Sequence, residues 1–220
     1  MADLETIADT LRAFYGALPA PPSDPFALFV WEVLSARASY ARRDAAMAAL
    51  KRIRALTPDA LARAPRKKLE EAVALAGSHR DERLQALTAG ADAFRRAPDL
   101  PRRIRGPLRD AWRALRALPY MTPDAACRMR LFAAGQRVLP VDARVTRVVT
   151  RLGIVDAAGS RRPATIRRAL DSRLPADLDA YRQAHLYLIH HAEATCTARD
   201  PHCGICPLRA GCPEGLRRAH

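Results

Sequence analysis

Residues 196–212 read CTARDPHCGICPLRAGC, and this stretch holds four of the chain's five cysteines. Their spacing is Cys-x6-Cys-x2-Cys-x5-Cys, at Cys196, Cys203, Cys206 and Cys212. The central pair can chelate one metal centre, Gly204 lets the backbone turn tightly, and the outer cysteines can complete four thiolates. Zinc sites usually show two short cysteine pairs, whereas a wider outer spacing suits an iron–sulfur cluster held by four cysteines. The spacing predicts a metal site, with iron–sulfur favoured and zinc left open.

The cysteines also bear on the redox environment. The N-terminal residues Met1-Ala2-Asp3-Leu4-Glu5 are acidic and do not resemble a signal peptide, so we expect a cytosolic, reducing location in which disulfides are rare. Free surface thiols are the remaining alternative for the four cysteines, and their clustering argues against it. The fifth, Cys127, lies in an apolar helical context and is predicted to be a core thiol.

Outside this stretch, apolar residues recur at helical spacing, and the fold class predicted is all-α. A capping residue followed by proline marks helix starts at Asp24, Thr57 and Thr122. The segment from Pro25 to Ala38 is the most apolar, which predicts a buried central helix. Its one charge between Pro25 and Ala36 is Glu32, and an acid on an apolar helix is expected to have a raised pKa and to hold a proton near neutral pH.

A second informative helix is predicted from about Ala143 to Leu152. Its apolar residues fall at i, i+3, i+4 and i+7 and form one stripe, with a basic stripe beside it. The apolar stripe comprises Val145, Val148, Val149 and Leu152, and the basic stripe comprises Arg144, Arg147 and Arg151. Asp142 precedes this helix and is expected to cap it, while Gly153 is a natural C-terminal cap.

The charge of the chain indicates a partner class. Lys and Arg number 37 against 23 Asp and Glu, for a formal net charge of +14. A chain this basic usually faces a polyanion, most often nucleic acid, although a basic enzyme without such a partner is the alternative. No stretch approaches the roughly 20 apolar residues that span a bilayer, so no membrane partner is expected.

Three motifs together resemble the helix-hairpin-helix DNA glycosylase superfamily, of the endonuclease III and adenine-mismatch glycosylase type. They are the cysteine loop with the preceding residues 191–195, residues 139–148 (LPVDARVTRV), and residues 25–37 (PFALFVWEVLSAR). The resemblance implies a [4Fe-4S] cluster on the four cysteines. It also implies two all-α domains with a DNA-binding cleft between them: a six-helix domain over residues 25–135, and a cluster domain over residues 1–24 and 136–220.

The resemblance further implies which residues act. Asp142 matches the catalytic carboxylate, and Glu32 matches the catalytic Glu of the adenine-mismatch branch. An ionised Asp142 would stabilise positive charge on the sugar as the base leaves. For Glu32 the alternatives are a side chain that reaches the surface or one that pairs with a buried arginine. The DNA-contacting residues expected are Arg37, His79, Arg80, Tyr120, Thr122, Arg144 and Arg147.

The chain departs from the family at the hairpin. The family reads Leu-Pro-Gly-hydrophobic-Gly, followed two residues later by a Schiff-base Lys in bifunctional enzymes; residues 118–124 here read LPYMTPD. Both glycines are absent, and the Lys position is Asp124, which is either a first-turn acid or an extra carboxylate in an altered pocket. A β-lyase needs an amine nucleophile, so we expect weak or absent lyase activity and a weakened phosphate clamp.

These observations predict a base-excision repair glycosylase that removes a damaged or mispaired base. We expect a monomer on double-stranded DNA, cytoplasmic and associated with the nucleoid. The alternative is a catalytically impaired iron–sulfur protein that recognises damaged or structured DNA, and a zinc-bearing basic binding module is a third reading. The Glu32–Asp142 pair favours a purine substrate, whereas Leu34-Ser35-Ala36 favours oxidised pyrimidines.

Overall fold

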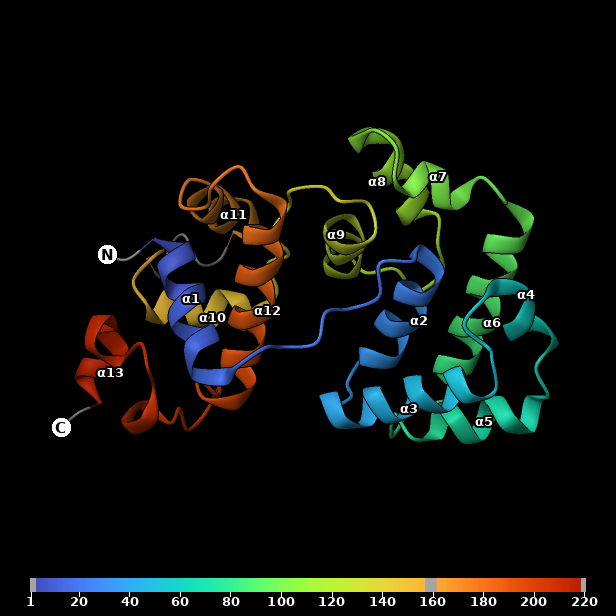
Figure 1. Ribbon diagram of the computed structural model, residues 1–220, viewed down its shortest axis with the longest axis horizontal. Coiled ribbons are helices and arrows are strands. Elements are labelled where there is room, and N and C mark those ends of the chain that lie inside the picture. The colour runs from blue at the N-terminus through green and yellow to red at the C-terminus, as the bar shows by residue number, and fades with distance from the viewer. Residues whose placement is uncertain (1–2, 157–161, 219–220) are drawn as a thin grey trace. The chain divides into compact units, whose positions relative to one another are not determined.

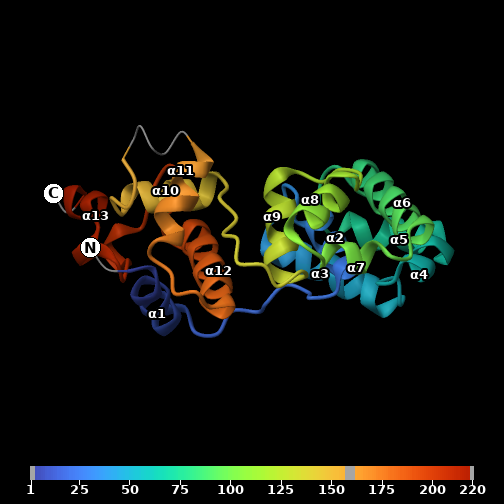
Figure 2. The same ribbon diagram turned by 90° about the horizontal axis from the view of Figure 1, so that it is seen from above.

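The computed structural model describes residues 3–156 and 162–218 (Figures 1 and 2). Throughout these ranges the regular structure is helical, with no β-strand, which confirms the predicted all-α class. No helix among the described residues is both long enough and apolar enough to cross a membrane. The chain divides into two compact units, one of Pro21–Gln136 and one of Met1–Ala20 with Arg137–His220.

The unit formed by both ends of the chain will be called the terminal unit. Its longest described helix, α12, packs against α1 and α10, and α13 packs against the cysteine-loop turn η3 (Figure 1). The helices of this unit are α1 (Leu4–Tyr15), α10 (Ala143–Arg151), α11 (Pro163–Asp171), α12 (Leu178–Ala194) and α13 (Pro213–Arg217), with the 3-10 turns η2 (Cys203–Ile205) and η3 (Arg209–Gly211).

The unit over residues 21–136 will be called the middle unit. It contains eight helical segments where six were expected, and two of them, α4 and α7, have only 6 and 5 residues. They are α2 (Pro25–Ser35), α3 (Tyr40–Arg52), α4 (Pro58–Arg63), α5 (Arg66–Ala74), α6 (Arg80–Arg96), α7 (Leu100–Ile104), α8 (Leu108–Arg116) and α9 (Pro123–Phe132). The observed unit boundaries follow Ala20 and Gln136, a few residues from the expected domain boundaries after residues 24 and 135.

Helix α2 is the centre of the middle unit. It packs against α3, α6, α7 and α9, and its apolar side chains are buried as its composition predicts. Phe29 of α2 is only 1% exposed because α6 has a glycine where it passes this ring. A Cβ at Gly90 would lie 2.0 Å from the Phe29 ring, so only glycine permits this approach.

The predicted capping residues begin their helices. Asp24 accepts hydrogen bonds from the backbone N–H groups of Phe26 and Ala27, at 3.0 and 2.9 Å. Thr57 and Thr122 cap α4 and α9 in the same way, each with proline at the first helical position. Gly153 after α10 has φ 72°, as expected for a C-terminal cap.

Candidate active site and metal centre

Asp142 is the N-terminal cap of α10. Its Oδ1 accepts hydrogen bonds from the backbone N–H groups of Arg144 and Val145, at 2.9 and 3.0 Å. The helix exists because Val145, Val148 and Val149 are almost completely buried on one face, as the apolar stripe predicts. The side chain of Asp142 is 13% exposed. The carboxylate is therefore rigidly held at a helix N-terminus, where its negative charge is favoured.

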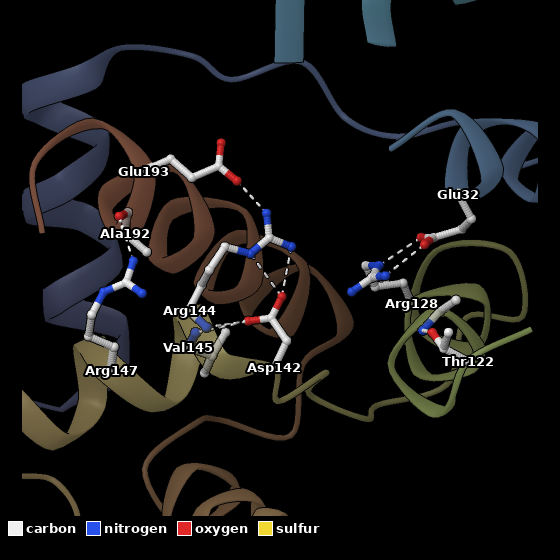
Figure 3. A network of polar contacts seen from close by, with 10 residues as sticks. Glu32, Thr122, Arg128, Asp142, Arg144, Val145, Arg147, Ala192 and Glu193 are labelled. Atoms are coloured by element: carbon white, nitrogen blue, oxygen red, sulfur yellow. Dashed lines mark hydrogen bonds and ion pairs between the residues drawn. The ribbon is translucent and has the colours of Figure 1, made fainter. Parts of the chain in front are cut away.

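Arg144 holds the other oxygen of the same carboxylate (Figure 3). Its Nε and Nη2 donate to Asp142 Oδ2 at 2.9 and 2.7 Å, and its Nη1 pairs with Glu193 of α12. Burial opposes the charge of Arg144, but Asp142 and Glu193 outweigh it and raise the pKa of the guanidinium. Arg144 thus lies between two carboxylates and remains charged.

The rest of the basic stripe on α10 supports the cysteine loop. Arg147 donates to the carbonyls of Cys196 and Ala192, at 2.9 and 2.8 Å. Arg151 donates to the carbonyls of Thr197 and Ala198 at 2.7 and 3.0 Å and to Cys196 Sγ at 3.3 Å. The DNA contact expected of Arg147 stays a prediction. The contacts observed for its guanidinium are with Cys196 of the loop and with Ala192 near the end of α12, the second of which is drawn in Figure 3.

The four cysteines of the loop line one cavity. Its other walls include apolar side chains of α10 and the loop, among them Val148, Leu152 and Leu208. Among residues 3–156 and 162–218 no group of three His, Cys, Asp or Glu side chains is placed to hold a metal ion. Four thiolates around one cavity are the donor set of a cubane cluster, in which each thiolate would bind a different iron.

A buried polar chain lies behind the loop. The Tyr15 hydroxyl lies 2.8 Å from His191 Nδ1 and 2.6 Å from Thr195 Oγ1, and His191 Nε2 lies 3.7 Å from Cys206 Sγ. Burial lowers the pKa of His191 to about 4, so this imidazole is neutral. Burial also raises the pKa of the Cys206 thiol, and a bound metal would supply the positive charge that its thiolate needs.

In the middle unit, Glu32 of α2 is paired with Arg128 of α9. Arg128 Nε donates to Glu32 Oε1 at 2.8 Å and its Nη2 donates to Oε2 at 2.7 Å (Figure 3). The two side chains are 4% and 14% exposed. This geometry is the alternative in which Glu32 pairs with a buried arginine. Its role as a proton donor stays a prediction.

The hairpin between α8 and α9 retains a left-handed turn without glycine. Tyr120 takes the place of the family's first glycine and has φ 58°. Its side chain is 54% exposed. Thr122 accepts a hydrogen bond from the backbone N–H of Ala125 at 3.2 Å, and Asp124 lies in the first turn that follows. A side chain in this conformation costs about 1 kcal/mol, so the turn geometry is kept at an energetic penalty.

Two further loops of the middle unit carry left-handed residues. Arg37 after α2 has φ 55° and His79 before α6 has φ 68°. Arg37 Nη1 lies 3.3 Å from His79 Nε2, and His79 Nδ1 lies 3.2 Å from Glu82 Oε1. Since a guanidinium only donates, His79 accepts at Nε2 and donates from Nδ1. Arg80 pairs with its neighbour Asp81 at 3.0 Å.

Arg83 of α6 connects these two loops by hydrogen bonds. It is 3% exposed, and it donates to the carbonyls of Ala36 in one loop and of Gly77 and Ser78 in the other. Burial lowers the pKa of Arg83. One buried side chain therefore fixes the backbone beside both Arg37 and His79.

Residues 30–176 match the family model of HhH-GPD superfamily base excision DNA repair proteins. The chain belongs to this superfamily. Residues 196–212 also match the iron–sulfur binding domain of endonuclease III, which identifies the cysteine loop as an iron–sulfur loop. Cys196, Cys203, Cys206 and Cys212 are the cysteines of this match, and the predicted cofactor is confirmed at the level of the loop.

Named relatives of this HhH-GPD chain are similar over about half of its length. A thymine/uracil-DNA glycosylase of Pyrobaculum aerophilum is 30% identical over 113 residues, which is 50% of this chain and 49% of that protein. An adenine DNA glycosylase of Mycolicibacterium smegmatis is 38% identical over 109 residues, 46% of this chain and 36% of the relative. The chain thus spans less than half the length of these curated relatives.

A solved structure supports the fold of the superfamily. The structure of a trapped endonuclease III–DNA covalent intermediate, in an estranged-adenine complex, aligns with a TM-score of 0.75 over all of both chains at 22% identity. At this identity the likeness establishes the shared fold. The expectation of an endonuclease III-type, two-unit helical fold is confirmed.

Three residues of this HhH-GPD chain bear on the candidate sites and were missed by sequence reasoning. They are Arg83, Arg128 and Glu193. Arg128 had a usable signal, since it lies one turn after Asp124, a residue already singled out. Arg83 and Glu193 had no such signal. Arg151 was predicted as part of the basic stripe of α10, and its contacts with the loop come from the structure.

Proposed function

We propose that the chain is a monofunctional DNA glycosylase that removes a damaged or mispaired base from double-stranded DNA. The observation that carries the proposal is Asp142, an ionised and immobilised carboxylate at the start of α10, within the segment that matches the HhH-GPD family. As the glycosidic bond breaks, positive charge develops on the deoxyribose. A fixed carboxylate stabilises that charge, and water then attacks the sugar.

The proposal assigns DNA contacts to seven residues, which come from both units. A basic surface releases counterions from DNA, so if about five phosphates are neutralised, log affinity should fall with log salt at a slope of about −4.5. The residues assigned are Arg37, His79, Arg80, Tyr120, Thr122, Arg144 and Arg147. We further propose that the protein acts as a monomer on chromosomal DNA of the nucleoid, which light scattering and chromatin fractionation can test.

The iron–sulfur cluster is assigned no step of base release. Bound to the four cysteines, it would supply a rigid, redox-capable centre that orders the loop. Arg147 and Arg151 join that loop to α10, the helix that Asp142 caps. We propose that the loop and the catalytic carboxylate are positioned by the same helix.

The deciding experiment uses end-labelled duplexes that contain an oxidised pyrimidine, adenine opposite 8-oxoguanine, an alkylated purine, uracil opposite guanine, or an abasic site. Each reaction is divided into samples with and without hot alkali. Strand cuts that appear only after alkali support monofunctional release. Asp142→Asn should abolish these cuts while DNA binding survives, and undiminished release by that variant would contradict the role of Asp142.

A second candidate is a DNA-binding protein without glycosylase activity. It is favoured by the four hydrogen bonds that Asp142 accepts from Arg144 and Val145, since a carboxylate has about four lone-pair sites. The guanidinium also offsets the charge that catalysis needs. Binding to every duplex without a cut in any sample would support this candidate over the first.

A further inference from the structure

The ion pair of Glu32 and Arg128 has the geometry of a permanent pair. Each carboxylate oxygen receives its own N–H, from Nε at 2.8 Å and from Nη2 at 2.7 Å, and both side chains are largely shielded from water. Two parallel charge-assisted hydrogen bonds of this kind are among the strongest in proteins. Arginine does not deprotonate, so the pair keeps Glu32 as a carboxylate.

Charged groups of both signs lie on the elements packed against α2. Arg43 of α3 lies over the ring of Trp31, 4.4 Å from its centroid, and Arg83 of α6 donates to the carbonyl of Ala36 at the C-terminal end of α2. These elements also carry Arg102 and Arg103 on α7 and Asp124 one turn before Arg128 on α9, and Asp24 caps α2 itself. The arginines do not titrate between about pH 5 and 9.

The state of Glu32 bears on which base can leave. Adenine is a poor leaving group until its ring is protonated, and protonation needs an acid in the site. A pyrimidine with two ring carbonyls leaves without it: the C1′–N1 bond breaks, and its electron pair goes to N1 and spreads over the carbonyl oxygens. Water then bonds to C1′ and loses its proton to solvent. A carboxylate that holds no proton can serve the second route only.

We propose that Arg128 is a specificity-determining positioning residue that keeps Glu32 ionised, so that the chain releases pyrimidine bases departing as anions and not purines departing protonated. This inference rests on the proposed glycosylase function. Arg128 acts through Glu32, as a neutralising partner of a group that would otherwise serve as an acid. The pair as a whole is neutral and does not repel a departing anion.

Single-turnover release is the first test, from duplexes with uracil opposite guanine and with adenine opposite 8-oxoguanine, between about pH 5.5 and 8.5. Uracil release should vary less than about threefold with pH, with adenine release at least about 100-fold slower. Adenine release that falls about tenfold per pH unit would overturn the proposal, since it is the signature of a carboxylic acid donor. In the Arg128→Met variant, adenine release should fall with pH in this way. In Arg130→Met, which changes an arginine of the same helix, it should not.

The Arg128→Met variant leaves a buried carboxylate and can fail to fold, so the double variant Glu32→Gln/Arg128→Met is made beside it. Adenine release by the double variant should show no acid limb, and a limb there would contradict the assignment of the acid to Glu32.

An NMR measurement that does not depend on catalysis tests the role of Arg128 separately from the proposed glycosylase function. In protein labelled with ¹³C at glutamate carboxyls, the Glu32 resonance is the one lost in Glu32→Gln. At about pH 5.5 it should stay at the ionised shift in the wild type and in Arg130→Met, and it should move to the protonated shift in Arg128→Met. A protonated shift in the wild type would overturn the role of Arg128. If no duplex is cut at all, the proposed function fails, and this resonance still decides whether Arg128 keeps Glu32 ionised.

Discussion

Arg144 donates two hydrogen bonds to a single oxygen of Asp142, from Nε at 2.9 Å and from Nη2 at 2.7 Å. The other oxygen is held by the backbone at the start of α10. The same guanidinium also pairs with Glu193, so it can leave Asp142 for a phosphate without losing all of its partners. The helix cap is therefore a permanent restraint on Asp142, whereas DNA can compete for Arg144.

If Arg144 moves to a phosphate, Arg144→Gln should weaken DNA binding. The slope of log affinity against log salt should become shallower by about 1, because one phosphate contact is lost. Arg12→Gln is the matched control, since Arg12 is an exposed arginine of the terminal unit paired with Asp9. Fluorescence anisotropy across a salt series measures the DNA affinity of both variants. An unchanged slope for Arg144→Gln would show that Arg144 makes no phosphate contact.

Asp142 should also contribute to stability as a helix cap. Asp142→Ala removes the acceptor for two backbone N–H groups and should lower the free energy of unfolding by about 1 kcal/mol. Asp142→Asn keeps that acceptor and should lose less. Denaturant titrations of both variants separate capping from catalysis. Equal losses would show that the cap is not the stabilising contact.

The cysteine loop should carry iron only when its four thiols are intact. Cys206→Ala should abolish the broad absorption at about 400 nm and release the iron, because a cubane needs all four ligands. The terminal unit should then melt at lower temperature, since cluster binding and folding of the loop are coupled. Cys127→Ala, which removes a buried thiol of α9 in the middle unit, should keep the absorption and the iron.

Arg83 should contribute to the stability of the middle unit. Arg83→Met removes the donor of the Ala36 and Ser78 carbonyls and should cost about 2 kcal/mol of unfolding free energy. Arg80→Met, an exposed arginine in the first turn of the same helix, should stay within about 0.5 kcal/mol of the wild type. Similar melting temperatures for the two variants would argue against the bridging role of Arg83.

Lyase chemistry should be absent in the wild type. Borohydride traps a Schiff base between an amine and an abasic sugar, and Asp124 offers no amine. Incubation with abasic duplex and borohydride should therefore give no covalent complex. Asp124→Lys restores an amine at the matching position and should give a trapped complex on a denaturing gel. A covalent complex formed by the wild type would show that a lysine elsewhere in the chain, or an N-terminal amine, acts as the nucleophile.

Local features of this chain were predictable because they depend on near neighbours. The Asp142 and Thr122 caps, the apolar stripe of α10 and the burial of α2 all follow from spacing within a turn or two of helix. The cysteine spacing predicted a metal-binding loop for the same reason, since its four cysteines lie within 17 residues, and the family match then identified the loop as iron–sulfur. Such patterns need no knowledge of how helices pack.

The partners of the long charged side chains were decided by the tertiary structure alone. Glu32 and Arg128 are 96 residues apart, Arg83 and Ala36 are 47 apart, and Arg147 reaches a carbonyl 49 residues away. An arginine side chain extends well beyond its own helical turn, so helical periodicity fixes its face but not its partner. For that reason the sequence by itself determined the fold class, the helix caps and the metal loop. Helix packing decided which charged side chains are paired, and it therefore also decided the ionisation state of Glu32.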